Sequence, residues 1–219
     1  MAHYLRRHWY DFALGFAILT LAWQAFARYD GLRLILLLNL VVMFLHEYEE
    51  YHLPGGAQWV LNLTLGGERD KLDRRPLNQV NGTFNNVILW IFYLLPVIWP
   101  NLIWLGLGPV IVGLVVQFIA HAVVANIRLR SWYNPGLATT IVGFVPVGIW
   151  YITFVYQHHL IRGTDWIWSV VYAAVFLGVG IIFIGFRLMG KPFENEPFAP
   201  EEIARFDGAR RRAKLGLTR

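Results

Sequence analysis

Six stretches of the chain are each about 20 residues long and almost wholly apolar, and they limit its possible folds more than any other feature. A helix needs about 20 apolar residues to cross a bilayer, because the hydrocarbon core is roughly 30 Å thick and the rise is about 1.5 Å per residue. The sequence therefore predicts an all-α, polytopic membrane helical bundle of six transmembrane helices. The six predicted spans are 11–29, 32–51, 85–105, 108–127, 137–158 and 166–187.

The first apolar stretch also has features of a secretory signal peptide. Arg6 and Arg7 precede it, and Ala25-Phe26-Ala27 resembles a cleavage site. However, the stretch is too long for the apolar core of a signal peptide, and it is rich in aromatic residues. We therefore expect it to remain in the protein as the first membrane helix.

The composition supports a membrane protein and excludes several kinds of chemistry. Hydrophobic residues make up 57% of the chain and charged residues only 15%, whereas about a quarter of a typical soluble domain is charged. The ten tryptophans and ten tyrosines suit the membrane–water interfaces, where their amphipathic rings are enriched. The absence of cysteine excludes disulfides, thiolate nucleophiles, iron–sulfur clusters and thiolate-ligated haem.

The basic residues predict the orientation of the helices. With the N-terminus in the cytoplasm, all but three of the 19 lysines and arginines lie on the cytoplasmic side, the exceptions being Arg28, Arg33 and Arg162. Cytoplasmic loops of membrane proteins carry such an excess of positive charge. The N- and C-termini are therefore predicted to be cytoplasmic, in a multi-pass protein of the cell (cytoplasmic) membrane. Because the basic residues follow the loops rather than form one patch, no nucleic-acid partner is expected.

The chain is predicted to consist of a six-helix transmembrane domain, residues 1–187, and a basic cytoplasmic tail, residues 188–219. The cytoplasmic or interfacial segment 52–84 belongs to the first part, and we expect it to lie along the membrane and cover a cavity. In the tail, residues 201–214 are compatible with a helix whose basic residues attract anionic headgroups. A solvated, disordered tail is an equal alternative.

The second predicted span ends with ionisable residues, which are costly inside a membrane and usually face the interior of the bundle. Asn39, His46, Glu49 and Glu50 share one face of this helix. They do so because spacings of three, four and seven residues return to the same side of a helix. Glu47 is expected to point elsewhere.

The fourth predicted span repeats this pattern. Gln117, His121 and Arg128 form one stripe, at spacings of four and seven residues. His46 and His121 each lie six or seven residues from the cytoplasmic ends of their helices, which is roughly 10 Å below that surface. Further polar and aromatic candidates at the same end are Asn86, Trp90 and Tyr93 on the third span and Asn134 before the fifth.

The order of these residues resembles the HXXEE-domain membrane proteins. His46-Glu47-Tyr48-Glu49-Glu50 reads His-x-x-Glu-Glu, and it is followed by Pro54-Gly55-Gly56, His121, Arg130 and Tyr133-Asn134-Pro135-Gly136. The resemblance extends over roughly residues 40 to 185. It implies a membrane protein of several helices and points to His46, Glu49 and Glu50, and it supplies no reaction.

The leading hypothesis for these residues is a metal site. His46 and Glu50, four residues apart on a helix, can reach one ion, and His121 would complete a His₂Glu set with an open position. This set is typical of catalytic zinc, so the expected cofactor is a divalent metal ion, with zinc as first choice. Glu49 would then act as general base on a metal-bound water. A carboxylate-bridged di-iron site fits less well, because it draws on about four carboxylates.

We therefore expect an integral membrane enzyme, a metal-dependent hydrolase-like protein whose site lies at the cytoplasmic leaflet. Its expected partners are the lipid bilayer and an apolar or amphipathic substrate, lipid or isoprenoid-like, that enters laterally between helices two to five. The predicted metal ligands are His46, Glu50 and His121; the predicted catalytic residues are Glu49, Arg128 and Asn86; and the predicted substrate-binding residues are Asn39, Gln117, Trp90, Tyr93 and Asn134.

Three alternatives stand beside this hypothesis. A metal-free pair of glutamates, one of which keeps its proton, would suit an isomerase or a cyclase. The same carboxylates would bind the coupling ion of a proton- or ion-coupled small-molecule carrier. Finally, Glu49 and Glu50 would serve only the structure if they formed ion pairs with Arg128 or Arg130 and joined the second span to the fourth.

Overall fold

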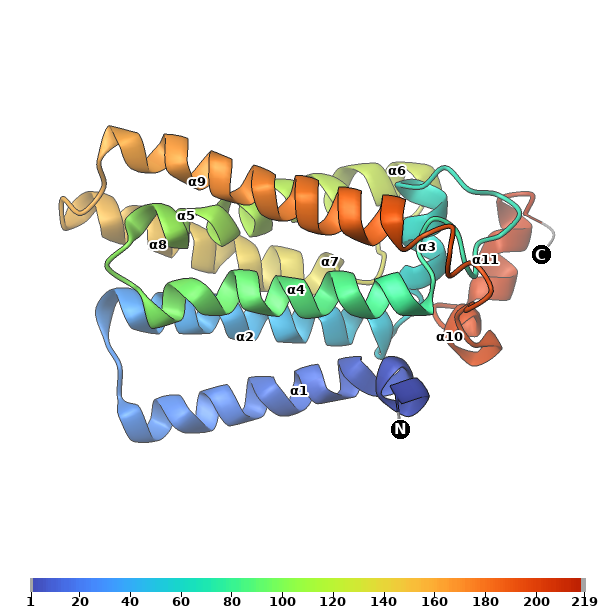
Figure 1. Ribbon diagram of the computed structural model, residues 1–219, viewed down its shortest axis with the longest axis horizontal. Coiled ribbons are helices and arrows are strands. Elements are labelled where there is room, and N and C mark those ends of the chain that lie inside the picture. Colours follow the sequence, from blue (N-terminus) through green and yellow to red (C-terminus); the bar gives the residue numbers. More distant parts are fainter. Residues whose placement is uncertain (1, 218–219) are drawn as a thin grey trace.

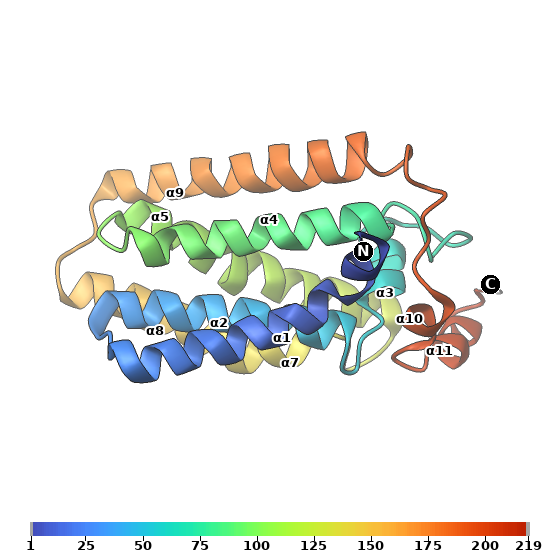
Figure 2. The same cartoon turned by 60° about the horizontal axis from the view of Figure 1, so that its bottom comes forward.

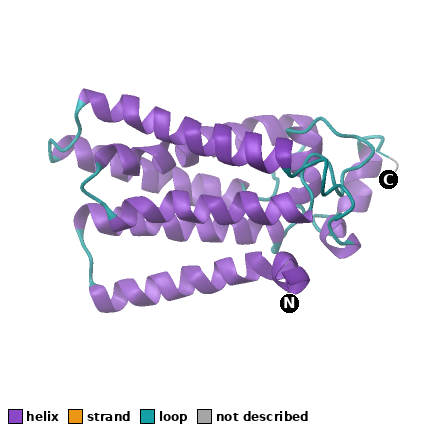
Figure 3. Cartoon of the chain, in the orientation of Figure 1, coloured by secondary structure: helices purple, strands orange, loops and turns teal. Residues whose placement is uncertain are grey.

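The protein is all-helical over the part of the chain that its computed structural model describes, which is the backbone of residues 2–217 and the side chains of residues 4–217 (Figures 1 and 3). Helices labelled η are π-helical and continue the α-helices beside them. The elements are α1 (Ala2–Ala27), α2 (Gly31–Tyr51), α3 (Ala57–Thr64), α4 (Gln79–Ile98), α5 (Ile103–Ile111), η1 (Val112–Gln117), η2 (Ile119–Ala125), α6 (Asn126–Leu129), α7 (Leu137–Thr139), η3 (Thr140–Phe144), α8 (Val145–Gln157), α9 (Gly163–Val175), η4 (Phe176–Leu188), α10 (Pro200–Ala204) and α11 (Gly208–Lys214).

Within residues 2–217, six helical stretches are long and apolar enough to cross a membrane, which confirms the predicted fold class. Three of them are the single helices α1, α2 and α4, and the other three are continuous runs of several elements. The stretches are Tyr4–Ala27, Gly31–Tyr51, Gln79–Ile98, Ile103–Leu129, Leu137–Gln157 and Gly163–Leu188.

The third span begins six residues earlier than the sequence pattern predicted. Asn78 caps α4, because its side chain accepts hydrogen bonds from the backbone N–H groups of Val80 and Asn81, both at 3.0 Å. The Asn81 side chain in turn accepts from the backbone N–H of Asn78 at 2.7 Å. This reciprocal arrangement is a capping box. Asn86, predicted near the start of the helix, therefore lies two turns inside it.

The helix α2 occupies the centre of the bundle and packs against α1, α4 and α8 (Figures 1 and 2). In its most apolar stretch 56% of the residues are buried, against 17% for both α1 and the span formed by α9 and η4. Large side chains fill the interior around α2, including Met43, Phe92, Tyr93, Phe144 and Tyr151. The polar face of α2 is therefore enclosed by other helices, whereas the outer spans expose apolar side chains suited to lipid.

The described part of the tail folds back onto one end of the bundle. A second apolar cluster joins Trp9 of α1 and Trp59 of α3 to Phe198 and Ile203 of the tail. The helix predicted over 201–214 is split into α10 and α11, which are separated by residues 205–207. The tail is thus part of a packed end rather than a separate solvated segment.

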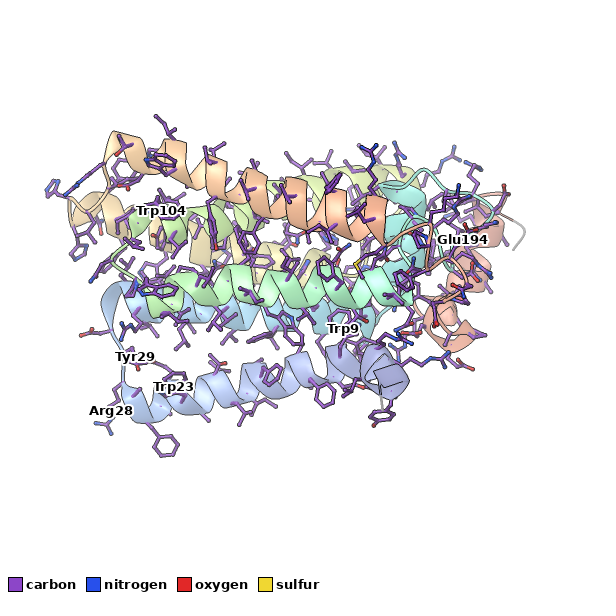
Figure 4. The ribbon with its side chains drawn as sticks, in the orientation of Figure 1. Trp9, Trp23, Arg28, Tyr29, Trp104 and Glu194 are labelled. Atoms are coloured by element: carbon purple, nitrogen blue, oxygen red, sulfur yellow. The ribbon has the colours of Figure 1, made fainter. Side chains whose placement is uncertain are left out.

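The two ends of the bundle differ in composition, and the first turns of α1 lie at the same end as α10 and α11 (Figure 1). Figure 4 places Trp23, Arg28 and Tyr29 at the opposite end from Glu194. An even number of spans requires this arrangement of the two ends of the chain. The cytoplasmic assignment of that end rests on the charge distribution and stays a prediction.

Candidate metal centre

The centre begins on α2, where His46 and Glu50 lie one helical turn apart and face the same side. Both side chains are buried, with exposed fractions of 0% and 6%. The Nε2 atom of His46 lies 3.7 Å from Oε1 of Glu50. The structure therefore agrees with the prediction that these two residues lie on one inward-facing side of α2.

The third member, His121, comes from η2 on the fourth span and is 2% exposed. Its Nε2 atom lies 3.3 Å from the same Oε1 atom of Glu50. The two imidazole rings are nearly perpendicular, at 89°, with centroids 5.0 Å apart. One potential ligand atom from each of His46, Glu50 and His121 lies within 4.8 Å of the other two. The structure therefore brings together the three side chains that were predicted to meet.

The Nδ1 atom of His121 is occupied by a hydrogen bond that fixes its tautomer. It lies 2.7 Å from Oδ1 of Asn134. The Nδ2 group of Asn134 donates to the backbone oxygen of His121 and to Oδ1 of Asn126, both at 2.8 Å, which fixes the orientation of the amide. Because Oδ1 can only accept, the proton of His121 resides on Nδ1. The Nε2 atom is then the ring nitrogen that faces Glu50, and it carries a lone pair when the ring is neutral.

The same logic applies to His46. Its Nδ1 atom lies 2.9 Å from the hydroxyl oxygen of Thr139. That hydroxyl donates to Oε2 of Glu49 at 2.5 Å, so it accepts from the Nδ1–H group of His46. The Nε2 atom of His46 is buried and has no hydrogen bond within the described residues. Both histidines thus direct Nε2 at one carboxylate oxygen, and in a neutral ring this nitrogen carries the lone pair.

Two lone pairs and a carboxylate repel one another unless a positive charge lies between them. Either a proton on one Nε2 or a metal ion can supply this positive charge. Ligand atoms about 2.0–2.1 Å from a tetrahedral ion are roughly 3.3 Å apart, close to the distances of 3.3 and 3.7 Å from Glu50 to the two histidines. The donor set could hold a divalent ion, with all three donor atoms within 4.8 Å of one another. Each histidine also has the outer hydrogen bond that metal-bound histidines usually make.

A family model described as a protein of unknown function with HXXEE motif matches residues 37–151. The chain belongs to the HXXEE family. No curated protein and no solved structure matches it. The matched residues include most of α2, all of α4 and the fourth span, and most of the fifth span, so they contain every side chain of the candidate centre.

The two glutamates of the HXXEE motif have different surroundings. Glu50 faces the histidines, whereas Glu49 turns toward the start of the fifth span. Its carboxylate accepts hydrogen bonds from the Tyr133 hydroxyl at 2.8 Å, from the backbone N–H of Ala138 at 3.0 Å, and from the backbone N–H and the hydroxyl of Thr139 at 2.7 and 2.5 Å. Four donors leave it little capacity to act as a base, so this geometry favours an orienting role over the expected general base.

The segment after the fourth span closes over His121. Gly136 has a φ of +97°, and a Cβ atom placed on it would lie 2.4 Å from Cε1 of His121. Glycine is required here both for the backbone conformation and for the close approach. Tyr133, in the same segment, bonds to Glu49, and burial is the main cause that raises the pKa of its hydroxyl. The Tyr-Asn-Pro-Gly segment thus supplies the outer support of the HXXEE centre.

Glu47, expected to point away from the site, is fully buried against α4. The indole N–H of Trp90 donates to its Oε2 atom, while its Oε1 atom has no hydrogen bond within the described residues. The periodicity of α2 correctly separated Glu47 from His46. The periodicity did not predict that α4 covers the face of α2 that carries Glu47, because this depends on how the helices pack.

The other predicted site residues are distributed around the centre rather than in it. Asn86 donates to the Tyr51 hydroxyl at 3.1 Å and to the backbone oxygen of Gly82 at 2.7 Å. Asn39 is buried on α2 two turns before His46, and Gln117 is half-buried. Arg128 is exposed and lines a surface hollow. The ion pair between Glu50 and Arg128 or Arg130, which was the structural alternative, is absent from the described residues, where both partners of Glu50 are histidines.

Aromatic rings occupy space beside the centre where a substrate cavity was expected. Tyr93, a predicted substrate-binding residue, is buried, and its ring lies 5.8 Å from that of Phe144. Phe144 in turn lies 5.2 Å from the ring of His46. Trp90 packs on Phe16 and Phe44 in addition to its bond with Glu47. These side chains form packed walls around the centre.

Proposed function

We propose that this HXXEE protein is an integral membrane metalloenzyme whose His46, Glu50 and His121 bind a divalent metal ion of the zinc type. One observation carries the proposal: two buried histidines, each bonded to the protein through Nδ1, direct Nε2 at one carboxylate oxygen. An unpartnered ionisable group inside a span is costly, and a shared cation removes that cost for all three residues at once.

The number of ligands favours a catalytic role. Structural zinc sites are usually closed by four protein ligands, whereas catalytic sites have three and an open position. When bound, such an ion polarises an ester or phosphoryl oxygen and makes a coordinated water acidic enough to supply hydroxide near neutral pH. We therefore favour hydrolysis as the reaction class.

The position of the centre favours an apolar substrate. His46 lies five residues before the end of α2, and His121 lies eight residues before the end of its span. Both are thus within the membrane-spanning part of the bundle. A lipid or an isoprenoid-like molecule can approach that depth from the bilayer, whereas a polar solute would first have to leave water.

Metal content tests the first part of the proposal. Purified without chelators and supplied with zinc, the protein is expected to hold about one ion per chain, measured by elemental mass spectrometry. His121→Ala and His46→Ala should lose the ion. His158→Ala is the matched control, because that histidine is exposed at the other end of the bundle and bonds only to its own helix.

Two results would contradict metal binding: a wild-type protein that takes up no zinc, or His121→Ala protein that retains it. The first would favour a structural contact between a protonated His121 and Glu50, with stability as the property lost in the variants. Hydrolysis is tested separately on zinc-loaded protein with lipid esters and isoprenyl phosphates. A metal-loaded protein that cleaves none of them would remove the enzymatic part and leave the metal site in place.

A further inference from the structure

A basic hollow lies at the end of the bundle that carries α3, α6 and α11 (Figure 1). It has a volume of about 200 Å³ and is formed by three segments that are distant in sequence: the end of α3 with the loop after it, the end of the fourth span, and the tail. Its lining residues are Leu63, Arg69, Arg128, Arg130, Lys214, Leu215 and Leu217.

Four of these seven residues are cations, and none is an acid. Within residues 2–217 none of the four forms an ion pair, although nearby arginines do: Arg74 pairs with Asp73 and Arg75 with Glu194. Glu68, next to Arg69 in sequence, is used otherwise, because its carboxylate accepts from the backbone N–H groups of Arg69 and Asp70 at 2.8 and 2.9 Å. The positive charge of the hollow is therefore not neutralised by the described residues around it.

The tail is held in place over this hollow by specific contacts. Arg69 donates to the backbone oxygen of Leu215 at 3.4 Å, and Arg211 donates to the hydroxyl of Ser131 at 3.2 Å. Leu217 is buried in the second apolar cluster. The cations of the tail and of the fourth span are thus positioned together, in contrast to the independent side chains of a flexible basic tail.

A second hollow, of about 440 Å³, adjoins the first because Arg130 lines both. Its other lining residues include Ile127 and Trp132, whose exposed fractions are 70% and 97%. Exposed aliphatic and tryptophan side chains at the end of a span are suited to the acyl region and the headgroup level of a bilayer. A molecule that extended from the basic hollow into this one would pass from polar to apolar surroundings.

We propose that the basic hollow binds the phosphate headgroup of an anionic membrane lipid whose chains lie along the neighbouring apolar hollow. Phosphate is the group that clusters of arginine and lysine recognise best, through charge and through the forked donors of arginine. The volume equals about six or seven water molecules, which suits a compact phosphomonoester better than a large headgroup. The site stands whether or not His46, Glu50 and His121 bind a metal ion.

Lipid binding to the purified full-length protein tests this proposal. Dioleoyl phosphatidic acid and dioleoyl phosphatidylcholine are added in detergent, and bound lipid is counted by native mass spectrometry. The double variant Arg128→Gln/Lys214→Gln is compared with Arg187→Gln/Arg210→Gln, which removes the same charge at exposed positions that do not line the hollow. At about 1 kcal/mol per basic residue, the first variant should bind phosphatidic acid about thirtyfold more weakly. The second should stay within about twofold of the wild type.

Several outcomes would overturn the proposal. Equal losses in the two double variants would show that only the overall charge matters, and equal binding of phosphatidylcholine would exclude recognition of the anionic headgroup. Inorganic phosphate that binds as tightly as phosphatidic acid would identify a soluble anion as the ligand. Thermal unfolding checks that each variant is folded, and Arg69→Gln, at an exposed loop position, provides a second test of the hollow.

Discussion

The candidate metal centre and the basic hollow lie at the same end of the molecule, but their polar groups are arranged in opposite ways. In the centre, the Nδ1 atoms of His46 and His121 are bonded to protein, and the Nε2 atoms point inward at Glu50. In the hollow, four cations surround an open space and have no acid among them. The first arrangement suits a cation enclosed by protein, and the second suits an anion presented by the bilayer.

A short stretch of chain connects the two regions. Asn126 bonds to Asn134, which supports His121, while Arg128 and Arg130 on the same stretch line the hollow. Proximity alone therefore does not determine what a side chain does here. Burial and hydrogen bonding do, and substitutions that affect one region should leave the other intact.

Gly136→Ala is expected to have the largest effect, and this effect should fall on the metal centre while the basic hollow is unchanged. The new Cβ would lie 2.4 Å from Cε1 of His121, at a backbone φ of +97°. Strain at a left-handed position and overpacking together should cost about 3 kcal/mol of unfolding free energy. Denaturation in detergent measures the loss, and zinc content should fall with it. Binding of phosphatidic acid at temperatures below unfolding should be unchanged.

Gly178→Ala is the control for this substitution, because nothing lies within 4 Å of a Cβ atom at that position. It should leave stability and metal content at wild-type values. A Gly136→Ala protein as stable as this control would mean that the segment over His121 is not packed as described.

A smaller effect, confined to the metal centre, is expected from Thr139→Val. The change keeps the shape of the side chain and removes the hydroxyl that links Nδ1 of His46 to Glu49. Loss of an outer hydrogen bond of this kind typically weakens metal binding about 10- to 100-fold. Competition for zinc with a chromogenic chelator measures the affinity. Binding of phosphatidic acid by the variant should equal that of the wild type.

Thr153→Val is a matched control, since Thr153 is exposed on α8, toward the other end of the same span. If both threonine variants bind zinc equally well, the hydroxyl of Thr139 does not orient His46. The tautomer inferred for that histidine would then lose its support.

The smallest effect is expected from pH, and it should act on the docking of the tail and not on the metal centre. Burial raises the pKa of Glu202 in α10 above that of an ordinary glutamate, although Arg205 and Arg7 lower it. The docked tail therefore holds this proton more tightly than the undocked chain does. Docking should be strongest below the ordinary pKa of glutamate and should weaken as the pH rises through the raised value.

Proteolysis of the tail should accordingly slow as the pH is lowered from neutrality toward the ordinary pKa of glutamate. Glu202→Gln should remove this pH dependence while keeping an acceptor for the backbone N–H of Ala199, which Glu202 now binds at 2.8 Å. A pH dependence that persists in the variant would assign it to another group. Zinc content of the two proteins should be equal.

The sequence predicted the spans and the convergence of His46, Glu50 and His121 because helix periodicity and membrane thickness determine which residues share a face and a depth. It predicted the start of α4 poorly, because Asn78 and Asn81 cap the helix with amides where the common signature has Glu or Gln at the third position. It could not assign Glu49, whose partners are the backbone groups of a helix that begins 88 residues later, at Leu137. That pairing depends on tertiary structure, which no local pattern contains.

The spacing of the centre along the chain has a consequence for biogenesis. His46 belongs to the second span, His121 to the fourth and Thr139 to the fifth, with 93 residues between His46 and Thr139. At about 5–20 residues per second, a ribosome needs roughly 5 to 20 s to make that stretch. The buried glutamates of α2 therefore enter the bilayer well before their partners are synthesised. The three proposed ligands are all present only once the fourth span, which carries His121, has been made, and the outer hydrogen bond of His46 forms only with the fifth. Loading of an ion is therefore a late step in the maturation of the protein.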